Sequence, residues 1–83
     1  MEIRAEVELV WEYGDAERAR AIARAIDVDN ASLPEGLRKN LNLKTRSEGG
    51  RVITKVKYRG EIETLIAALD DLVFAIKVAE EVL

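Results

Sequence analysis

The sequence predicts an α+β fold, a two-layer sandwich in which two helices cover one face of a three-stranded antiparallel sheet. Polar and apolar residues alternate with the period of a strand in three segments: 2–11, 41–48 and 51–59. Two other segments, 16–26 and 61–83, repeat apolar residues at the three-and-four spacing of a helix. The order strand, helix, strand, strand, helix gives a sheet with one apolar face, which the two helices must cover.

The first strand is predicted over Glu2 to Trp11, with one face toward the core and one toward water. Its core-facing side chains are expected to be Ile3, Ala5, Val7, Leu9 and Trp11. Asp15 is a plausible N-cap for a helix over Ala16 to Ile26, whose core positions are Ala19, Ile22, Ala23 and Ile26. The segment 27–30 is expected to break this helix, and 31–40, which holds the only proline, to form an irregular connection.

The next two strands are predicted to form a hairpin through the two-residue turn Gly49-Gly50. Alternation directs eight side chains to the core: Leu41, Leu43, Thr45, Ser47, Val52, Thr54, Val56 and Tyr58. It directs seven others to the open face: Asn42, Lys44, Arg46, Ile53, Lys55, Lys57 and Arg59. The element order is KH-like, although the Gly-x-x-Gly loop of KH domains is missing.

The last helix, Glu61 to Leu83, is apolar on two sides. One side is expected to form the core: Ile62, Leu65, Ile66, Leu69, Leu72, Val73, Ile76, Ala79 and Leu83. The second side holds Ala67, Phe74, Ala75, Val78 and Val82. A domain of 83 residues can cover one face of such a helix, so the second is expected to bind another molecule.

The residue types argue against catalysis. The chain has no histidine and no cysteine, which removes the commonest general base, the thiol nucleophile and most transition-metal sites. No phosphate-binding glycine loop is present, and we expect neither an enzyme nor a cofactor. Asp70 and Asp71 are adjacent on a helix, so their side chains point about 100° apart and suit no catalytic pair. They are either solvated surface or polar anchors at a partner interface.

Charge is unevenly distributed along the chain. Residues 38–59 carry eight basic residues and one acidic residue, whereas the remainder carries five and fifteen. The open face of the sheet therefore has a basic stripe: Lys44, Arg46, Lys55, Lys57 and Arg59. This stripe either contacts nucleic-acid phosphates, without reading sequence, or is a solvated face that Glu6 and Glu8 partly neutralise. No signal peptide or membrane span is visible, and a cytoplasmic location is the simplest interpretation.

Three groups of residues give the chain a family resemblance. The first two are Ala5-Glu6-Val7-Glu8-Leu9 and Val28-Asp29-Asn30. The third and most specific is the last helix, with Glu63-Thr64-Leu65, Asp70-Asp71-Leu72 and Ile76-Lys77-Val78-Ala79-Glu80. In order and spacing, these motifs resemble the Pcc-type small subunit of the KEOPS tRNA-modification complex, in its archaeal form. The resemblance extends over residues 1–83 as a single Pcc-type domain.

The resemblance implies a non-catalytic subunit. KEOPS forms threonylcarbamoyladenosine next to the anticodon of tRNA, and the chemistry belongs to its Kae/TsaD-type transferase subunit. A Pcc-type subunit would dimerise, with itself or a paralogue, dock on the transferase through its last helix, and help hold tRNA. The contact residues implied are Asp70, Asp71, Phe74, Ile76, Val78 and Val82, with tRNA possible along the basic stripe. The alternative is a free-standing KH-like RNA-binding module that uses the open sheet face.

Overall fold

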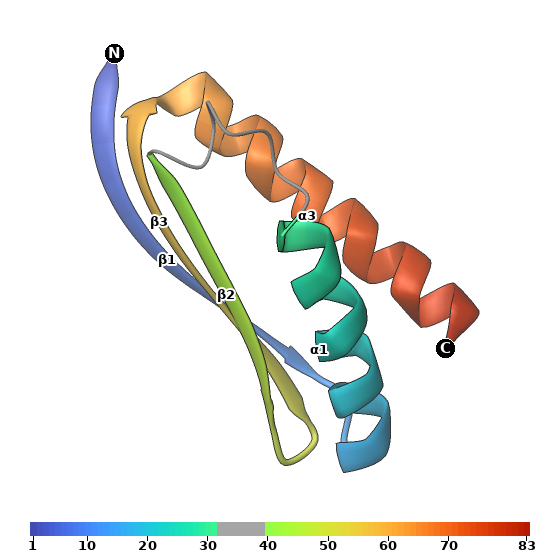
Figure 1. Cartoon of the computed structure of the whole chain (residues 1–83). Helices are drawn as coiled ribbons and strands as arrows, with labels where there is room; N and C mark the ends of the chain where they lie inside the picture. The colour runs from blue at the N-terminus through green and yellow to red at the C-terminus, as the bar shows by residue number, and fades with distance from the viewer. Residues whose placement is uncertain (32–39) are drawn as a thin grey trace.

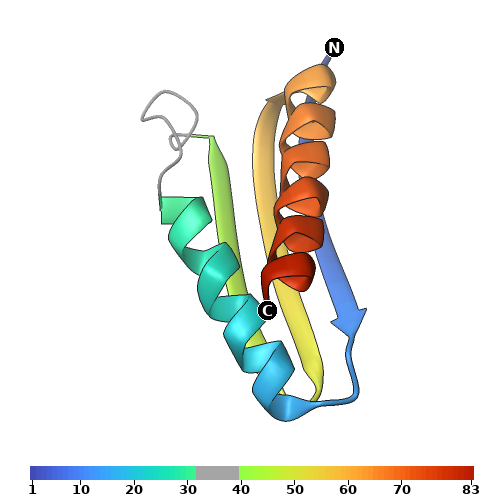
Figure 2. The same ribbon diagram turned by 90° about the vertical axis from the view of Figure 1, so that its right-hand side faces the viewer.

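The computed structural model describes residues 1–31 and 40–83, the side chains of 28–31 excepted. The elements are β1 (Glu2–Glu12), α1 (Ala16–Ala31), β2 (Leu41–Glu48), β3 (Arg51–Glu61) and α3 (Ile62–Val82). Both helices lie on the same face of a three-stranded antiparallel sheet (Figures 1 and 2). The α+β sandwich and the element order predicted from the sequence are therefore confirmed. The irregular connection predicted for 31–40 lies mostly outside the described residues.

The strand order is β1-β3-β2, so β3 is the central strand. Its core face is fully buried because it has a neighbour on both sides and helices above it. The one buried polar side chain described there, Thr54, shares a hydrogen bond of 3.0 Å with the Thr45 hydroxyl. Ile53 lies on the open face, as alternation predicts, yet it is only 7% exposed. It is paired with Val10 on one side and Arg46 on the other, because it lies on the central strand of the sheet.

The hairpin turn packs closely on the loop that follows β1. Gly49 has a φ of 59°, and Gly50 comes so close to the chain that a Cβ there would lie 2.9 Å from Gly14 backbone atoms. The backbone N–H groups of Tyr13 and Gly14 both donate to the Gly50 carbonyl oxygen, at 2.8 and 3.1 Å. The predicted Gly-Gly turn is confirmed, and Gly50 also allows this contact between two backbones.

Asp15 caps α1 as predicted. Its Oδ1 accepts hydrogen bonds from the backbone N–H groups of Glu17, at 2.9 Å, and Arg18, at 3.4 Å. The predicted end of the helix at residue 26 is wrong, because α1 continues to Ala31. Asp and Asn cost a helix only a few tenths of a kcal/mol each, and 27–30 contains neither Gly nor Pro to stop it.

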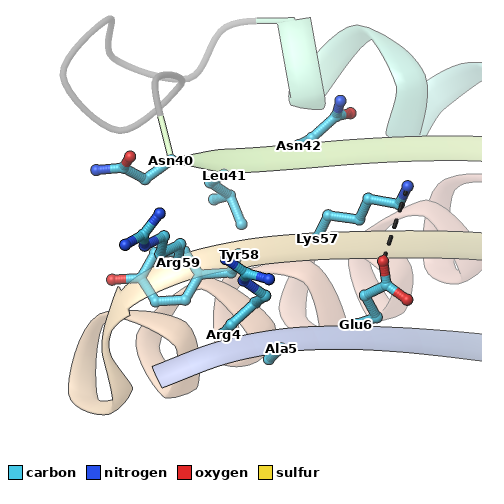
Figure 3. A pocket seen from close by; sticks show the side chains of 9 residues that line it. All are labelled: Arg4, Ala5, Glu6, Asn40, Leu41, Asn42, Lys57, Tyr58 and Arg59. Atoms are coloured by element: carbon cyan, nitrogen blue, oxygen red, sulfur yellow. Dashed lines mark ion pairs between the residues drawn. The ribbon is translucent and has the colours of Figure 1, made fainter. Parts of the chain in front are cut away.

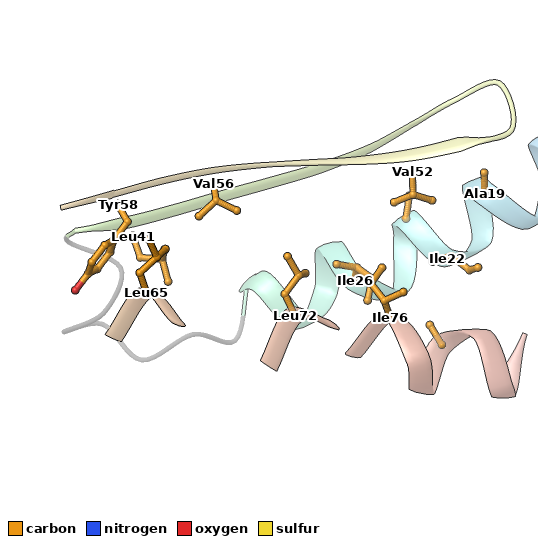
Figure 4. Packing of buried hydrophobic residues seen from close by; sticks show 12 residues of the cluster. Ala19, Ile22, Ile26, Leu41, Val52, Val56, Tyr58, Leu65, Leu72 and Ile76 are labelled. Carbon is orange, nitrogen blue, oxygen red and sulfur yellow. The ribbon is translucent and has the colours of Figure 1, made fainter. Parts of the chain in front are cut away.

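The core lies between the two helices and the two strands β2 and β3 (Figure 4). Helix α1 packs mainly on β2, whereas α3 packs on α1 and β3. Neither helix packs closely on β1, so its five core-facing side chains are only half-buried. The buried apolar residues are Ala19, Ile22, Ala23, Ile26, Leu41, Val52, Val56, Tyr58, Leu65, Leu72, Ile76 and Ala79.

The core face of α3 is narrower than the periodicity predicts. Leu65, Leu72, Ile76 and Ala79 are buried, and Leu69 is half-buried. Four residues assigned to the core from the sequence are instead exposed: Ile62, Ile66, Val73 and Leu83. Figure 1 shows α3 running from the end of β3 across the helical layer and away from the sheet. A helix that leaves the sheet at an angle contacts the core along a thin line, which exposes Ile62, Ile66 and Val73 on one side of that line.

Candidate interaction surfaces

Helix α3 presents an apolar line to the outside of the helical layer. We call Ala67, Phe74, Val78 and Val82 the outer stripe; they follow at spacings of seven, four and four residues. Phe74 is 68%, Val78 42% and Val82 76% exposed. Exposed apolar residues that stand singly need no explanation, but a continuous line along one helix side indicates a binding surface. Of the five residues predicted for the second side, the four of the outer stripe are exposed, whereas Ala75 is half-buried and packs against the core.

A second apolar line lies on the side of α3 that faces β1. We call Ile62, Ile66 and Val73 the β1-side stripe. Ile66, Val73 and Glu80 follow at intervals of seven, so they share one side of the helix. The Glu80 carboxylate accepts a hydrogen bond from Tyr13, which follows the end of β1. The side of α3 that carries Glu80, Val73 and Ile66 is therefore the side toward β1. Helix α3 therefore has two separate exposed apolar stripes.

The two aspartates predicted to anchor a partner lie within or next to the outer stripe. Asp70 and Asp71 are exposed, and neither makes a hydrogen bond or ion pair within the described chain. Asp71 is four residues after Ala67 and three before Phe74, so it lies within the outer stripe. Asp70 shares the polar line between the two stripes with Glu63, Lys77 and Glu81. This arrangement leaves both carboxylates available to a partner.

The placement of Ile76 corrects the predicted contact set. This side chain is only 2% exposed and packs in the core with Leu72 and Ile26 (Figure 4). A residue two positions after Phe74 lies about 200° away around the helix, on the opposite side. Ile76 therefore stabilises the fold, and of the predicted apolar contact residues only Phe74, Val78 and Val82 are exposed to a partner.

A cluster around Tyr13 fastens the far end of α3 to the rest of the molecule. The Tyr13 hydroxyl donates to Glu80 Oε1 at 2.6 Å, and Arg18 Nη2 donates to the Glu80 carbonyl oxygen at 3.5 Å. The Arg18 guanidinium lies 5.8 Å from the centre of the Tyr13 ring. Burial, and then the hydrogen bond to Glu80, raise the pKa of Tyr13 well above its ordinary value. Sequence reasoning missed this cluster because its members are up to 67 residues apart.

The basic stripe on the open sheet face is largely neutralised. Carboxylates of β1 lie opposite or diagonal to cations of β3 in four ion pairs: Glu2–Arg59 at 3.4 Å, Glu6–Lys57 at 3.8 Å, Glu8–Lys55 at 4.0 Å and Glu12–Arg51 at 3.1 Å. Arg46 bonds Glu48, whose pKa it lowers by that hydrogen bond and by its charge. Of the five residues of the stripe, Lys44 alone lacks an ion pair with any described residue.

Within residues 1–31 and 40–83, no group of acidic side chains is placed to hold a metal ion. No described helix is long and apolar enough to cross a membrane.

No protein-family model matches the chain, and no curated protein does. The resemblance to the KEOPS small subunit therefore rests on the motifs quoted above.

Proposed function

We propose that this chain is a non-catalytic assembly subunit that binds partner proteins through the outer stripe of α3. The observation that carries the proposal is the exposure of Phe74, Val78 and Val82 along one side of the longest helix. Full burial of a Val or Phe side chain is worth roughly 1.5–3 kcal/mol, so three of them in a line can support a stable interface. Apolar anchors of this kind, with a rim of charged residues, are typical of protein–protein contacts.

The charges beside the outer stripe indicate the chemistry of the partner. Asp70, Asp71 and Glu81 make this side of α3 acidic, and Lys77 is the one basic residue there. A complementary partner is an amphipathic helix with an apolar line and basic residues at its border. Through the resemblance, we identify this partner as a helix of the Kae/TsaD-type transferase subunit of KEOPS. The chain would then dimerise and join two assemblies that modify tRNA.

The proposal is tested by co-expression with a tagged transferase subunit, followed by size-exclusion chromatography with light scattering. We expect the wild-type chain to co-elute and Phe74→Glu or Val78→Glu to abolish co-elution, with unchanged circular dichroism. Ile66→Glu is the matched control, because it makes the same change on the β1-side stripe of the same helix. Loss of binding in Ile66→Glu alone would move the contact to the other stripe. Separate elution of the wild-type chain would refute the KEOPS assignment.

The alternative function, a free-standing RNA-binding module, has weaker support. Ion pairs engage four of the five residues of the basic stripe, which reduces the charge available to phosphates. This alternative requires tRNA affinity without any partner protein. Reversing the charge of Lys44, Arg46, Lys55 and Lys57 together should then abolish binding and flatten its dependence on salt. An unchanged affinity and salt slope would leave the stripe as a solvated face.

A further inference from the structure

The register between β1 and β3 places two arginines directly opposite each other. Arg4 on β1 is paired with Arg59 on β3, and alternation directs both side chains to the open face. Like charges at directly opposite positions destabilise a sheet. The repulsion between the paired Glu2 and Glu61 next to them is offset by two ion pairs. Arg59 bonds Glu2, and the N-terminal amine bonds Glu61 at 2.8 Å. Arg4 forms no ion pair with any residue in the described ranges.

These two arginines are among the residues that line a hollow of about 410 Å³ (Figure 3). All three strands contribute to its polar lining: Arg4 and Glu6 from β1, Lys57 and Arg59 from β3, Asn42 from β2, and Asn40 just before β2. The one carboxylate in this lining, Glu6, is already paired with Lys57 at 3.8 Å. Within this lining the cations exceed the carboxylates by two. Arg59 also bonds Glu2, which lies outside the lining, at 3.4 Å, so Arg4 is the guanidinium that no described carboxylate engages. Two neutral amides in the lining can donate further hydrogen bonds.

We propose that Arg4 and Arg59, with the amides of Asn40 and Asn42, bind a phosphate group in this hollow. A guanidinium donates two parallel hydrogen bonds to a phosphate, and a bound anion between two arginines removes their repulsion. The adjacent hollow of about 350 Å³ supports the choice by contrast. Its lining has Glu6 and Glu8 against Lys55 and Lys57, so its charges balance and it offers no excess charge to an anion.

The phosphate can come from two sources with the same chemistry, a free or small-molecule phosphate or the backbone of an RNA. The hollow is on the face of the sheet opposite the helices, so the site is independent of partner binding through α3. No aromatic side chain described on the open face could stack a base, so any RNA would be bound without sequence preference.

Thermal unfolding of the full chain tests the site, with inorganic phosphate as the probe and potassium chloride of equal ionic strength as the reference. We expect phosphate to raise the melting temperature of the wild type and to leave that of Arg4→Gln unchanged. Without phosphate, Arg4→Gln should melt above the wild type, because it removes the like charge directly opposite Arg59. Arg20→Gln, an exposed change on α1, is the matched control and should keep the phosphate response. A phosphate response in Arg4→Gln equal to that of the wild type would overturn the proposal.

Two further measurements identify the source of the phosphate. In a phosphate titration followed by NMR, the amide signals of residues 4, 40, 42 and 59 should shift together. In the RNA experiment, a labelled RNA of tRNA size is titrated with the wild type and both variants. A loss of about tenfold in affinity in Arg4→Gln alone, with a salt slope lower by about one, assigns the site to RNA. If Arg4→Gln and Arg20→Gln bind the RNA equally well, and phosphate still shifts the NMR signals of the wild type, the site binds free phosphate.

Discussion

Tyr13 is a single residue that connects three elements. It follows β1, its backbone N–H bonds the hairpin turn at Gly50, and its hydroxyl bonds Glu80 near the end of α3. Because α3 leaves the sheet at an angle, its last turns have little contact with the strands. The hydroxyl of Tyr13 and the guanidinium of Arg18 hold those turns in place, and with them Val78 and Val82 of the outer stripe.

Tyr13→Phe should lower the free energy of unfolding by roughly 0.5–1.5 kcal/mol at neutral pH, since Glu80 loses its donor. The raised pKa of Tyr13 also predicts a pH dependence. Its contribution is complete below the unfolded pKa of about 10 and is lost as the pH rises through the folded pKa. Denaturant unfolding from about pH 8 to 11 should therefore show the wild type losing stability faster than the variant. Parallel pH curves would contradict this role.

Gly50 is predicted to accept a side chain only at a cost in stability. Gly50→Ala should cost about 1–3 kcal/mol, because the new Cβ meets backbone atoms of Gly14 and Asp15, which cannot turn aside. Gly49→Asn is the control: it has open space and a left-handed φ that asparagine adopts readily, so it should cost less than about 0.5 kcal/mol. Chemical denaturation measures both, and equal costs would show that the close backbone approach is unimportant.

At the scale of the element, α3 combines a buried line and an exposed line. Ile76→Ala should cost roughly 2–5 kcal/mol of stability, because it leaves a cavity between α3 and α1. Phe74→Ala should change the stability of the isolated chain by no more than about 0.5 kcal/mol. Denaturant unfolding of the two variants checks the contrast, and a large cost for Phe74→Ala would place its ring in the core.

At the scale of the whole molecule, small size and exposed apolar surface point to association. The chain has 83 residues and extends over 39 × 20 × 16 Å, with two apolar stripes on α3 open to solvent. Chains of this length bury only about 60% of the surface that they expose when unfolded. Pairing with a second copy or a partner adds the burial that the single chain lacks.

If the chain dimerises as proposed, its melting temperature should rise with protein concentration, because a folded dimer is favoured by mass action. The measurement compares melting curves at concentrations about a hundredfold apart, with light scattering at both ends. The double variant Phe74→Glu, Ile66→Glu should melt independently of concentration, since it places a charge on both stripes. A wild-type mass of 9.3 kDa at every concentration would argue against a homodimer.

Most features that depend on residues close together in the sequence were predicted correctly, whereas those that depend on packing between distant segments were not. The hairpin, the Asp15 cap and the core faces of all three strands depend on residues within a few positions, and each was predicted correctly. The end of α1 was wrong because Asp27, Asp29 and Asn30 disfavour a helix too weakly to stop one. On α3, the three-and-four spacing grouped Ile66 and Val73 with the core, although each follows a buried residue, Leu65 or Leu72, by one position and points about 100° away from it.

The sequence alone determined which segments are strands and helices, and that one side of the last helix lacks a partner within the chain. Side-chain periodicity of two or 3.6 residues is a local property that any reader of the chain can measure. The tertiary structure decided that β3 is central, that Ile76 is buried while Phe74 is exposed, and that β1 glutamates neutralise most of the basic stripe. It also placed Arg4 opposite Arg59. These facts depend on strand register and helix angle, which packing between distant segments sets.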